Sequence, residues 1–354
     1  MLAPIAWRTP PRHYGPWELV TSLLTEGLVA RGVDVTLFAT RNSETAGRLE
    51  AVAPAGYEEN PAVDAKVWEF RHLSHLFEQA GRFDLIHNQA DFPAHAFSRL
   101  VDTPIVTTIH GFSSDRILPM YAAYADCVHF VAISDADRHP ALPYAATIHH
   151  GIRLDDFPFD PAGGNDLLFF GRIHPDKGAV EAIEAAAAAG LALDLYGIVQ
   201  DEAYARERVM PCVDGRRIRY HGAVGGAARA RALGGAKGLL HLIRFAEPFG
   251  LSVIEAMACG TPVIATRMGS MPELIEHGVN GFLIDDVTEA PAAIARLGEL
   301  DRAAVRASVV GRFSVERMVG DYLALYEAIV AGSLRPGVAL SSFSSSAGAS
   351  SVSS

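Results

Sequence analysis

Short apolar runs rich in β-branched residues alternate along this chain with longer segments of helical period. Strands that are apolar throughout are typical of parallel sheets buried on both faces, and parallel neighbours need crossover helices. The alternation therefore predicts an α/β protein made of βαβ units. In the first half we expect strands over residues 1–5, 33–39, 83–87, 104–109, 127–133 and 146–149, with a helix over 17–31.

A stretch with prolines and paired glycines, residues 153–165, predicts a linker, after which a second series of strands begins. We expect these strands over residues 166–170, 191–196, 218–220, 238–243, 262–265 and 282–284. A single core stops growing near roughly 250 to 300 residues, so a chain of 354 residues should form two domains. The predicted parts are a Rossmann-like domain over 1–157, a second over 158–312, a helix over 313–332 that crosses back to the first domain, and a disordered serine-rich tail over 333–354. Ligands of such sheets bind outside the carboxyl ends of the strands, which predicts a cleft between the domains.

The charge balance limits the partners of the chain. It has 30 Lys and Arg against 41 Asp and Glu, a net charge of −11, which argues against nucleic acid or an anionic membrane as the main partner. Residues 1–160 hold 12 basic and 20 acidic residues, and residues 161–354 hold 18 and 21, so a small anion would bind the second half more readily. No segment has the ~20 uninterrupted apolar residues of a membrane-spanning helix, although peripheral membrane contact stays open. Three widely spaced cysteines without a CxxC indicate a reducing, cytoplasmic location.

The segment 171–178, Gly-Arg-Ile-His-Pro-Asp-Lys-Gly, follows a predicted strand and opens a predicted helix. Glycines let the backbone approach a ligand, and a helix N-terminus offers free N–H groups with a partial positive charge. Arg172 and Lys177 add two full charges, and Lys177 is one of only three lysines beside 27 arginines. The segment fits a phosphate or diphosphate cradle; the alternative is a solvated turn.

A second segment runs from Glu247 to Ala265. It predicts a helix that starts after Pro248 and presents the N–H groups of Gly250 and Leu251 to an anionic or hydroxyl-rich ligand. Glu255 lies in an apolar run and needs hydrogen-bond donors, which ribose or sugar hydroxyls or an arginine could supply. If both glutamates lay on one helix they would be about 12 Å apart, more than in paired glycosidase carboxylates, which argues against a hydrolase dyad.

These segments together resemble the retaining family-4 glycosyltransferases of GT-B architecture. The resemblance rests on Gly171-Arg172 with Lys177-Gly178, on Glu247 and Glu255 with seven residues between them, and on the segment 258–265, Ala-Cys-Gly-Thr-Pro-Val-Ile-Ala. It extends to residues 269–283, 14–15, 108–111 and 150–152, and covers roughly residues 1 to 330. The order and spacing of these elements, rather than any one of them, are specific.

The resemblance implies a hexosyltransferase that moves a sugar from a nucleotide diphosphate sugar to a small-molecule or glycan acceptor with retention of configuration, without a metal or another cofactor. Its second domain would hold the donor and its first domain the acceptor. By this resemblance, the diphosphate would be bound by Gly15, Gly171, Arg172 and Lys177, and the ribose by Glu255. The donor sugar and phosphate would be bound by Glu247 and by the main-chain N–H groups of Phe249, Gly250 and Leu251. His110 would face the sugar. Arg172, Lys177, Glu247 and His110 form the implied catalytic set.

Other functions are less compatible with the sequence. The histidine pairs form no HExxH or comparable ligand set for a metal, Ser252 lies outside a GxSxG motif, and no GxGxxG follows residues 1–5. Pro16 stands where the family often has a second glycine, and it offers no N–H to a phosphate. Ser270, at another such position, forms a predicted capping box with Glu273. A sugar phosphorylase of the same fold and a non-catalytic sugar or nucleotide binder stay open as alternatives.

Overall fold

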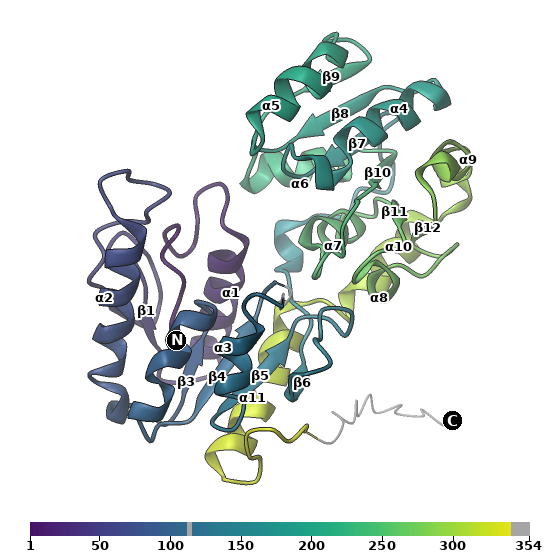
Figure 1. Cartoon of the computed structure of the whole chain (residues 1–354). Helices are drawn as coiled ribbons and strands as arrows, with labels where there is room; N and C mark the ends of the chain where they lie inside the picture. The colour runs from purple at the N-terminus through teal and green to yellow at the C-terminus, as the bar shows by residue number, and fades with distance from the viewer. Residues whose placement is uncertain (112–114, 341–354) are drawn as a thin grey trace, which may run out of the picture.

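A computed structural model describes residues 1–111 and 115–340 and shows two α/β domains, each built around a parallel sheet (Figure 1). The N-terminal domain contains α1 (Pro16–Ala30), β1 (Thr36–Phe38), β2 (Arg48–Glu50), α2 (Ala65–Phe77), β3 (Ile86–Asn88), β4 (Ile105–Ile109), α3 (Leu118–Ala123), β5 (Val128–Ala132) and β6 (Tyr144–Thr147). The C-terminal domain contains β7 (Leu167–Phe170), α4 (Ala179–Ala189), β8 (Leu193–Tyr196), α5 (Glu202–Tyr204), β9 (Ile218–Tyr220), α6 (Gly226–Gly234), β10 (Gly238–His241), α7 (Leu251–Ala258), β11 (Val263–Thr266), α8 (Met271–Leu274), β12 (Gly281–Ile284), α9 (Ala290–Ala295) and α10 (Arg302–Val310). The last helix, α11 (Val315–Val330), follows α10. The α/β architecture predicted from the alternating pattern is confirmed.

The sheet of the N-terminal domain has the order β3-β4-β5-β6, with β1 and β2 paired beside it. The predicted strand over residues 1–5 is wrong in length, because only Leu2 pairs, through single bridges to Phe38 and Asn88. These bridges join β1 to β3, so this one residue connects the two groups of strands. The pairing also explains why Leu2 is fully buried.

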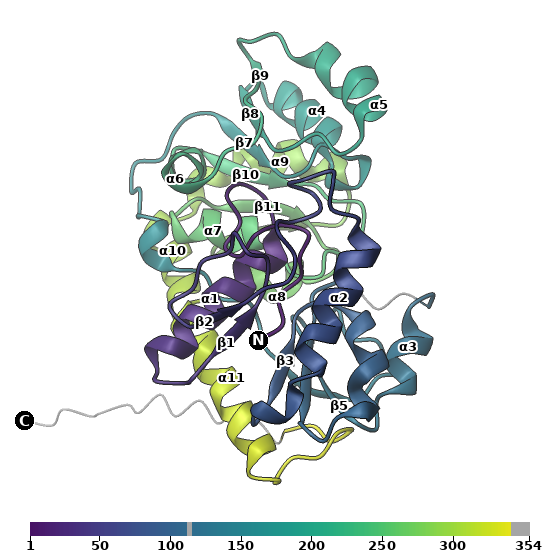
Figure 2. The same cartoon turned by 90° about the vertical axis from the view of Figure 1, so that its left-hand side faces the viewer.

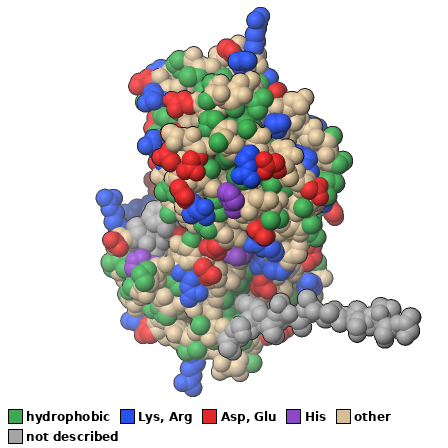
Figure 3. Space-filling view, turned by 90° about the vertical axis from the view of Figure 1, so that its right-hand side faces the viewer, with side chains coloured by type: hydrophobic (Ala, Val, Ile, Leu, Met, Phe, Trp, Pro, Cys, Tyr) green, Lys and Arg blue, Asp and Glu red, His purple; other side chains and the backbone are tan. Residues whose placement is uncertain are grey.

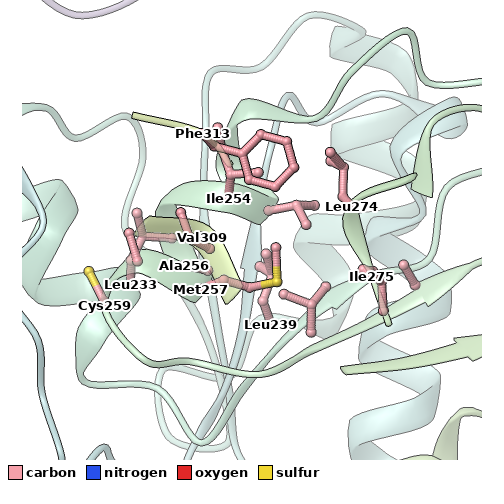
Figure 4. Packing of buried hydrophobic residues seen from close by; sticks show 14 of the residues in the cluster. Leu233, Leu239, Ile254, Ala256, Met257, Cys259, Leu274, Ile275, Val309 and Phe313 are labelled. Atoms are coloured by element: carbon pink, nitrogen blue, oxygen red, sulfur yellow. The ribbon is translucent and has the colours of Figure 1, made fainter. Parts of the chain in front are cut away.

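The sheet of the C-terminal domain has the order β12-β11-β10-β7-β8-β9, and all its strand pairs are parallel. Strand order reverses on either side of β7, which puts the carboxyl ends of β7 and β10 beside the switch point where doubly wound folds bind ligands. Helix α7 packs one apolar face against the sheet. Figure 4 shows Met257 and Ala256 of this helix among Leu239, Leu274 and Val309.

Helix α11 lies with the N-terminal domain, although it follows the C-terminal domain in sequence (Figures 1 and 2). Its buried residues Met318, Val319 and Tyr322 pack in one cluster with Val20 and Leu24 of α1. The chain therefore passes between the domains twice. The two passages touch, because Ile152 and Ser314 form a parallel bridge and the Ile152 N–H donates to Phe313 O at 2.8 Å.

The predicted disordered tail begins too early. Leu334 is buried, Leu340 is partly buried in the same cluster, and the Leu340 N–H donates to Ala145 O at 2.8 Å, so these two residues attach the stretch 333–340 to the N-terminal domain. The polar composition of this stretch led to the prediction of disorder, although Leu334 and Leu340 are apolar and pack against a core cluster. The rest of the predicted tail, residues 341–354, lies outside the described residues.

The surface carries charges of both signs. On the face seen in Figure 3, acidic and basic side chains are interspersed among apolar and uncharged ones. In the part of the chain that the structure describes, no helix is both long and apolar enough to cross a bilayer.

Candidate active site between the domains

A cavity of about 400 Å³ lies between the two domains. This volume is within the range of small-molecule sites. The cavity is lined from the N-terminal side by Tyr14, Gly15, Trp17, His110 and His150, and from the C-terminal side by Gly171, Arg172, Lys177, Arg229, His241, Glu247, Phe249, Gly250 and Leu251. The structure thus brings together all the predicted site residues except Glu255, which lines an adjoining cavity.

Lys177 and Glu247 form an ion pair on the C-terminal side of this cavity. The Lys177 ammonium donates to Glu247 Oε2, and the two side chains are only 12% and 14% exposed. The ammonium also lies 4.6 Å from the centre of the Phe245 ring. Burial lowers the pKa of Lys177, while the carboxylate opposes this shift.

Glu247 stays ionised in this environment. Burial favours its neutral form, but the His241 imidazole, 3.7 Å away, and the Lys177 charge lower its pKa to about 2. His241 Nε2 makes no hydrogen bond in the described residues, although the side chain is only 6% exposed. This histidine at the end of β10 was missed in the sequence, where nothing marks it among 14 histidines.

Arg172 lies at the boundary of the two domains. Its guanidinium donates to Gln200 Oε1, and it is close enough to Tyr14 to lower the pKa of that phenol against the larger effect of burial, which raises it. Tyr14 belongs to the N-terminal loop before α1. Arg172 therefore contacts residues of its own domain and also lies close to the N-terminal domain.

The loop with the two cations differs from the expectation in one respect. A 3₁₀ turn, Pro175–Lys177, separates the loop from α4, and the Lys177 N–H donates to His174 O at 3.0 Å. The N–H groups of Asp176, Lys177 and Gly178 are already satisfied within this turn, so the Lys177 side chain rather than these N–H groups would bind an anion here. Gly178 has φ 75°, and a Cβ there would lie 1.9 Å from Leu242 O, so only glycine allows this approach of the loop to the end of β10.

Helix α7 begins at Leu251, three residues after Pro248, with Gly250 as N-cap at φ 100°. Glu247 precedes the helix and is not on it, so the helical separation of the two glutamates does not apply. No hydrogen bond within the described residues uses the N–H groups of Gly250 and Leu251. The preceding backbone is held from both sides, since Ser134 donates to Pro248 O at 2.7 Å and Ser270 donates to Phe249 O.

His110 follows β4 and is 7% exposed. Its Nε2 donates to Gln89 Oε1, its Nδ1 lies 3.4 Å from His150 Nε2, and its ring stacks on Trp17 with centres 5.3 Å apart. Burial lowers the pKa of His110 to about 3, so the imidazole is neutral at ordinary pH. The neutral ring carries no charge, and both of its nitrogens have partners, so a ligand hydroxyl would have to replace the long contact between Nδ1 and His150.

Gly15 is the N-cap of α1 at φ 142°, with no side chain that caps the helix. Pro16, the first residue of α1, confirms that this N-terminus has one N–H fewer than a glycine would give. The loop before it brings Tyr14 and Gly15 to the same cavity as the cations of the C-terminal domain.

Glu255 has the arginine partner that the sequence left as an alternative to sugar hydroxyls. The carboxylate is 1% exposed and accepts hydrogen bonds from Nε and Nη2 of Arg229, the former at 2.8 Å. Burial raises the pKa of Glu255, and the guanidinium opposes this shift. Arg229 also lies 5.0 Å from the centre of the Phe170 ring and lines both cavities.

The predicted capping box of Ser270 and Glu273 is wrong. Ser270 makes no cap through its side chain, because its hydroxyl donates to Phe249 O. Glu273 instead reaches the other domain, where it accepts from the N–H groups of Asp135 and Ala136 at 3.0 and 2.7 Å and contacts His149 Nε2 at 2.9 Å. The spacing of a capping box was present, but the carboxylate found three donors across the domain boundary.

Two other polar residues that follow strands, His221 and Thr266, do not line this cavity. His221 stacks on Tyr196 and bonds to Asp194, and Thr266 donates to Ile243 O, so both support the fold. Within residues 1–111 and 115–340, no three His, Cys, Asp or Glu side chains are grouped as metal ligands.

Two family models match most of the chain. The model described as Glycosyltransferase Family 4 matches residues 18–156, and the model described as Glycosyl transferases group 1 matches residues 164–299. Among curated proteins, the D-inositol 3-phosphate glycosyltransferase of Streptomyces griseus is 29% identical over 59% of this chain and 49% of its own length. The first curated relatives are matched over about a quarter to a half of their length.

Solved structures share the fold over almost the whole chain. Sucrose-phosphate synthase from Thermosynechococcus elongatus superimposes with a TM-score of 0.75 at 20% identity, over 94% of this chain and 98% of that one. Anabaena Alr3699/HepE, solved with UDP and glucose, gives a TM-score of 0.71 at 18% identity over 89% and 96%. At this identity, the likeness shows a common architecture.

Proposed function

The chain belongs to the family-4 glycosyltransferases of GT-B architecture, and on this premise we propose that it transfers a hexosyl group from a nucleotide diphosphate sugar to an acceptor hydroxyl. The observation that carries the proposal is the cavity between the domains, where Arg172, Lys177 and Glu247 of one domain face Tyr14 and His110 of the other. Two cations, a buried carboxylate and a neutral imidazole suit a diphosphate joined to a sugar. Alr3699/HepE, of the same fold, was solved with UDP-glucose.

We further propose that the C-terminal domain binds the donor. Arg172 and Lys177 would hold the diphosphate, Glu247 and the N–H groups of Gly250 and Leu251 the sugar, and Glu255 with Arg229 would lie beside the ribose. Negative charge grows on the leaving diphosphate as the glycosidic bond breaks, and cations that bind it more strongly in the transition state accelerate this step. No metal or other cofactor enters this proposal.

The proposed stereochemistry is retention. The acceptor oxygen would attack the anomeric carbon on the face that the diphosphate leaves, the bond from the anomeric carbon to phosphate oxygen would break, and the acceptor proton would pass to the departing phosphate. His110, neutral and held by Gln89, would orient a donor hydroxyl rather than supply a charge. Closure of the two domains would exclude water from this exchange.

Binding of nucleoside diphosphates tests the donor site directly. Isothermal titration with UDP, ADP and GDP should show binding of at least one of them to the unmodified chain and a loss of about 10- to 150-fold in affinity for Arg172→Ala. Lys237→Ala, at the opposite end of β10, is the matched control. Unchanged affinity in Arg172→Ala would contradict the diphosphate assignment. Release of a sugar phosphate from a disaccharide and inorganic phosphate would favour a phosphorylase.

A further inference from the structure

A second cavity of about 500 Å³ lies on the N-terminal side of the first and shares Tyr14, Pro16, Trp17 and Arg172 with it. We call it the acidic cavity. The rest of its wall belongs to the N-terminal domain and includes Trp7, Glu18, Tyr57, Glu69, His72 and Asp91. Because the two cavities meet at Arg172, a molecule in the acidic cavity would lie next to the proposed donor site.

Three carboxyl groups line this cavity. Glu18 of α1 is 3% exposed and accepts from the Trp7 N–H at 3.1 Å, Glu69 of α2 faces the Tyr57 hydroxyl, and Asp91 accepts from the Tyr121 hydroxyl. Burial raises the pKa of all three, that of Glu18 to about 7. Among the residues that line the cavity, the one Arg or Lys is Arg172, at its junction with the donor side.

A buried histidine on the same wall has an unsatisfied ring nitrogen. His72 is 1% exposed, and its Nε2 donates to Ala3 O at 3.0 Å, which leaves Nδ1 as a hydrogen-bond acceptor. Nδ1 has no partner in the described residues. Burial lowers the pKa of His72 to about 4, so the ring is neutral and cannot bind an anion by charge.

Asp91 has an unusual backbone. It is the one residue other than glycine with positive φ, 62°, in the described ranges. Such a conformation is costly and persists where its surroundings fix it, often at binding sites. Here it turns the chain after β3, and Asp91 lines the cavity beside Phe92 and Pro93.

The wall thus offers the hydrogen-bond acceptors of three carboxyl groups, together with the rings of Trp7 and Trp17. Hydroxyl groups donate to such atoms, and the C–H face of a sugar ring packs on aromatic rings. A phosphate or carboxylate brings negative charge and few donors. Beside it these carboxyl groups would either repel it as anions or have to remain protonated, and both cost free energy at low solvent exposure.

We propose that the acidic cavity binds the sugar-accepting substrate and selects an uncharged, polyhydroxylated ring, a sugar or cyclitol without a phosphate or carboxylate. This inference rests on the proposed function, because it assigns the acceptor of that reaction. It separates this chain from the relative named for D-inositol 3-phosphate, whose name specifies a phosphorylated acceptor. It also agrees with the excess of acidic residues in the first half of the sequence.

The test uses the full chain with the nucleotide sugar that best raises its melting temperature. Release of nucleoside diphosphate is measured with pairs of acceptors that differ in one phosphate: myo-inositol and inositol 3-phosphate, glucose and glucose 6-phosphate, mannose and mannose 6-phosphate. We expect at least one neutral member to be accepted, with a kcat/KM at least tenfold above that of its phosphorylated partner. The ratio should fall as ionic strength rises, because salt screens the repulsion.

Glu69→Gln and Asp91→Asn test the origin of this selectivity. Each should reduce the neutral-to-phosphorylated ratio several-fold while nucleoside diphosphate affinity stays unchanged, which also shows that the variants are folded. Glu78→Gln, at the exposed far end of α2, should leave the ratio unchanged. Preference for a phosphorylated acceptor, or donor hydrolysis without acceptance of any neutral ring, overturns the inference. Absence of both nucleotide binding and donor turnover overturns the proposed function instead.

Discussion

Lys177 and Glu247 are 70 residues apart in sequence, yet their side chains pair in the cavity between the domains. Glu247 is the main compensation for the burial of Lys177, whereas His241 and Lys177 together compensate the burial of Glu247. Removal of either member of the pair therefore leaves the charge of the other less well compensated. The pair therefore couples the proposed diphosphate contact to the proposed sugar contact. A substitution at either position changes both.

Lys177→Ala should lower kcat by about 10- to 150-fold, because one charge-assisted hydrogen bond to the leaving group contributes about 1.5 to 3 kcal/mol. Steady-state release of nucleoside diphosphate measures the effect. Lys237→Ala, which removes the same charge away from the cavity, should retain full activity. Equal activity of both variants would contradict the role of Lys177.

His110→Asn should lower kcat at least tenfold without changing the shape of the pH profile between pH 5.5 and 8. The reason is that the pKa of His110 is lowered to about 3 by burial, so this ring does not titrate in that window. A step near pH 6.5 that is present in the unmodified enzyme and absent in the variant would show instead that His110 ionises.

His129→Asn is the matched control, since His129 is also buried, with its pKa lowered to about 4, but does not line the cavity. Both histidines should make the fold less stable as pH falls below their unfolded pKa near 6.5, because the unfolded chain then binds protons that the folded chain does not. Each variant should therefore lose less stability than the unmodified chain between pH 6.5 and 4.

Arg229→Ala should destabilise the C-terminal domain by about 3 to 5 kcal/mol at neutral pH, because it leaves the buried Glu255 carboxylate unpaired. The pKa of Glu255 is already raised by burial, and loss of the guanidinium raises it further. Stability of the variant should therefore fall as pH rises from the unfolded pKa near 4.3 to the raised folded value, and level off above it.

Adding Glu255→Gln to Arg229→Ala should restore part of the loss and remove this pH dependence. Urea unfolding at several pH values, followed by circular dichroism, gives the comparison. Additive effects of the two substitutions would mean that the ion pair is not the source of the loss.

Glu273→Gln should weaken the contact between the domains, because the carboxylate accepts from two N–H groups and contacts His149 across the boundary. Burial opposes ionisation of Glu273, yet these partners lower its pKa. Its contribution is therefore present above the unfolded pKa near 4.3 and is lost as pH falls through the folded pKa.

Small-angle X-ray scattering should show a larger radius of gyration for Glu273→Gln than for the unmodified chain at pH 7. Glu299→Gln, an exposed carboxylate paired only with Arg296 on its own domain, is the control. If the two variants scatter alike, the Glu273 contact does not hold the domains together.

The sequence predicts the strands well where they are buried apolar runs, such as β4 and β10, and less well elsewhere. Strand β2, Arg48–Glu50, is largely exposed and has no apolar run, so it was not predicted. It is defined by its parallel backbone pairing with β1, which side-chain character does not reveal. The N-terminal strand failed in the opposite way, since its apolar residues pair only at Leu2. The local pattern of apolar residues indicates which segments are buried, but it does not indicate which backbone segments form hydrogen bonds with a neighbouring strand.

The candidate site shows the same division. Arg172, Lys177 and Glu247 stood out because their spacing matched known motifs, and the structure places them around one cavity. Arg229 was missed, since one arginine in a Gly- and Ala-rich segment has no local signature and its partner is 26 residues away. Glu273 had the local signature of a cap, but contacts with the other domain decided its partners. Contacts between distant residues depend on the assembled fold.

The position of α11 on the N-terminal domain has a consequence for synthesis of the chain on the ribosome. The apolar side of α1, with Val20 and Leu24, is covered by residues that are translated about 300 positions later. A nascent chain must therefore keep this surface open, and in reach of chaperones, until the entire C-terminal domain has emerged. The domain translated first is the one completed last.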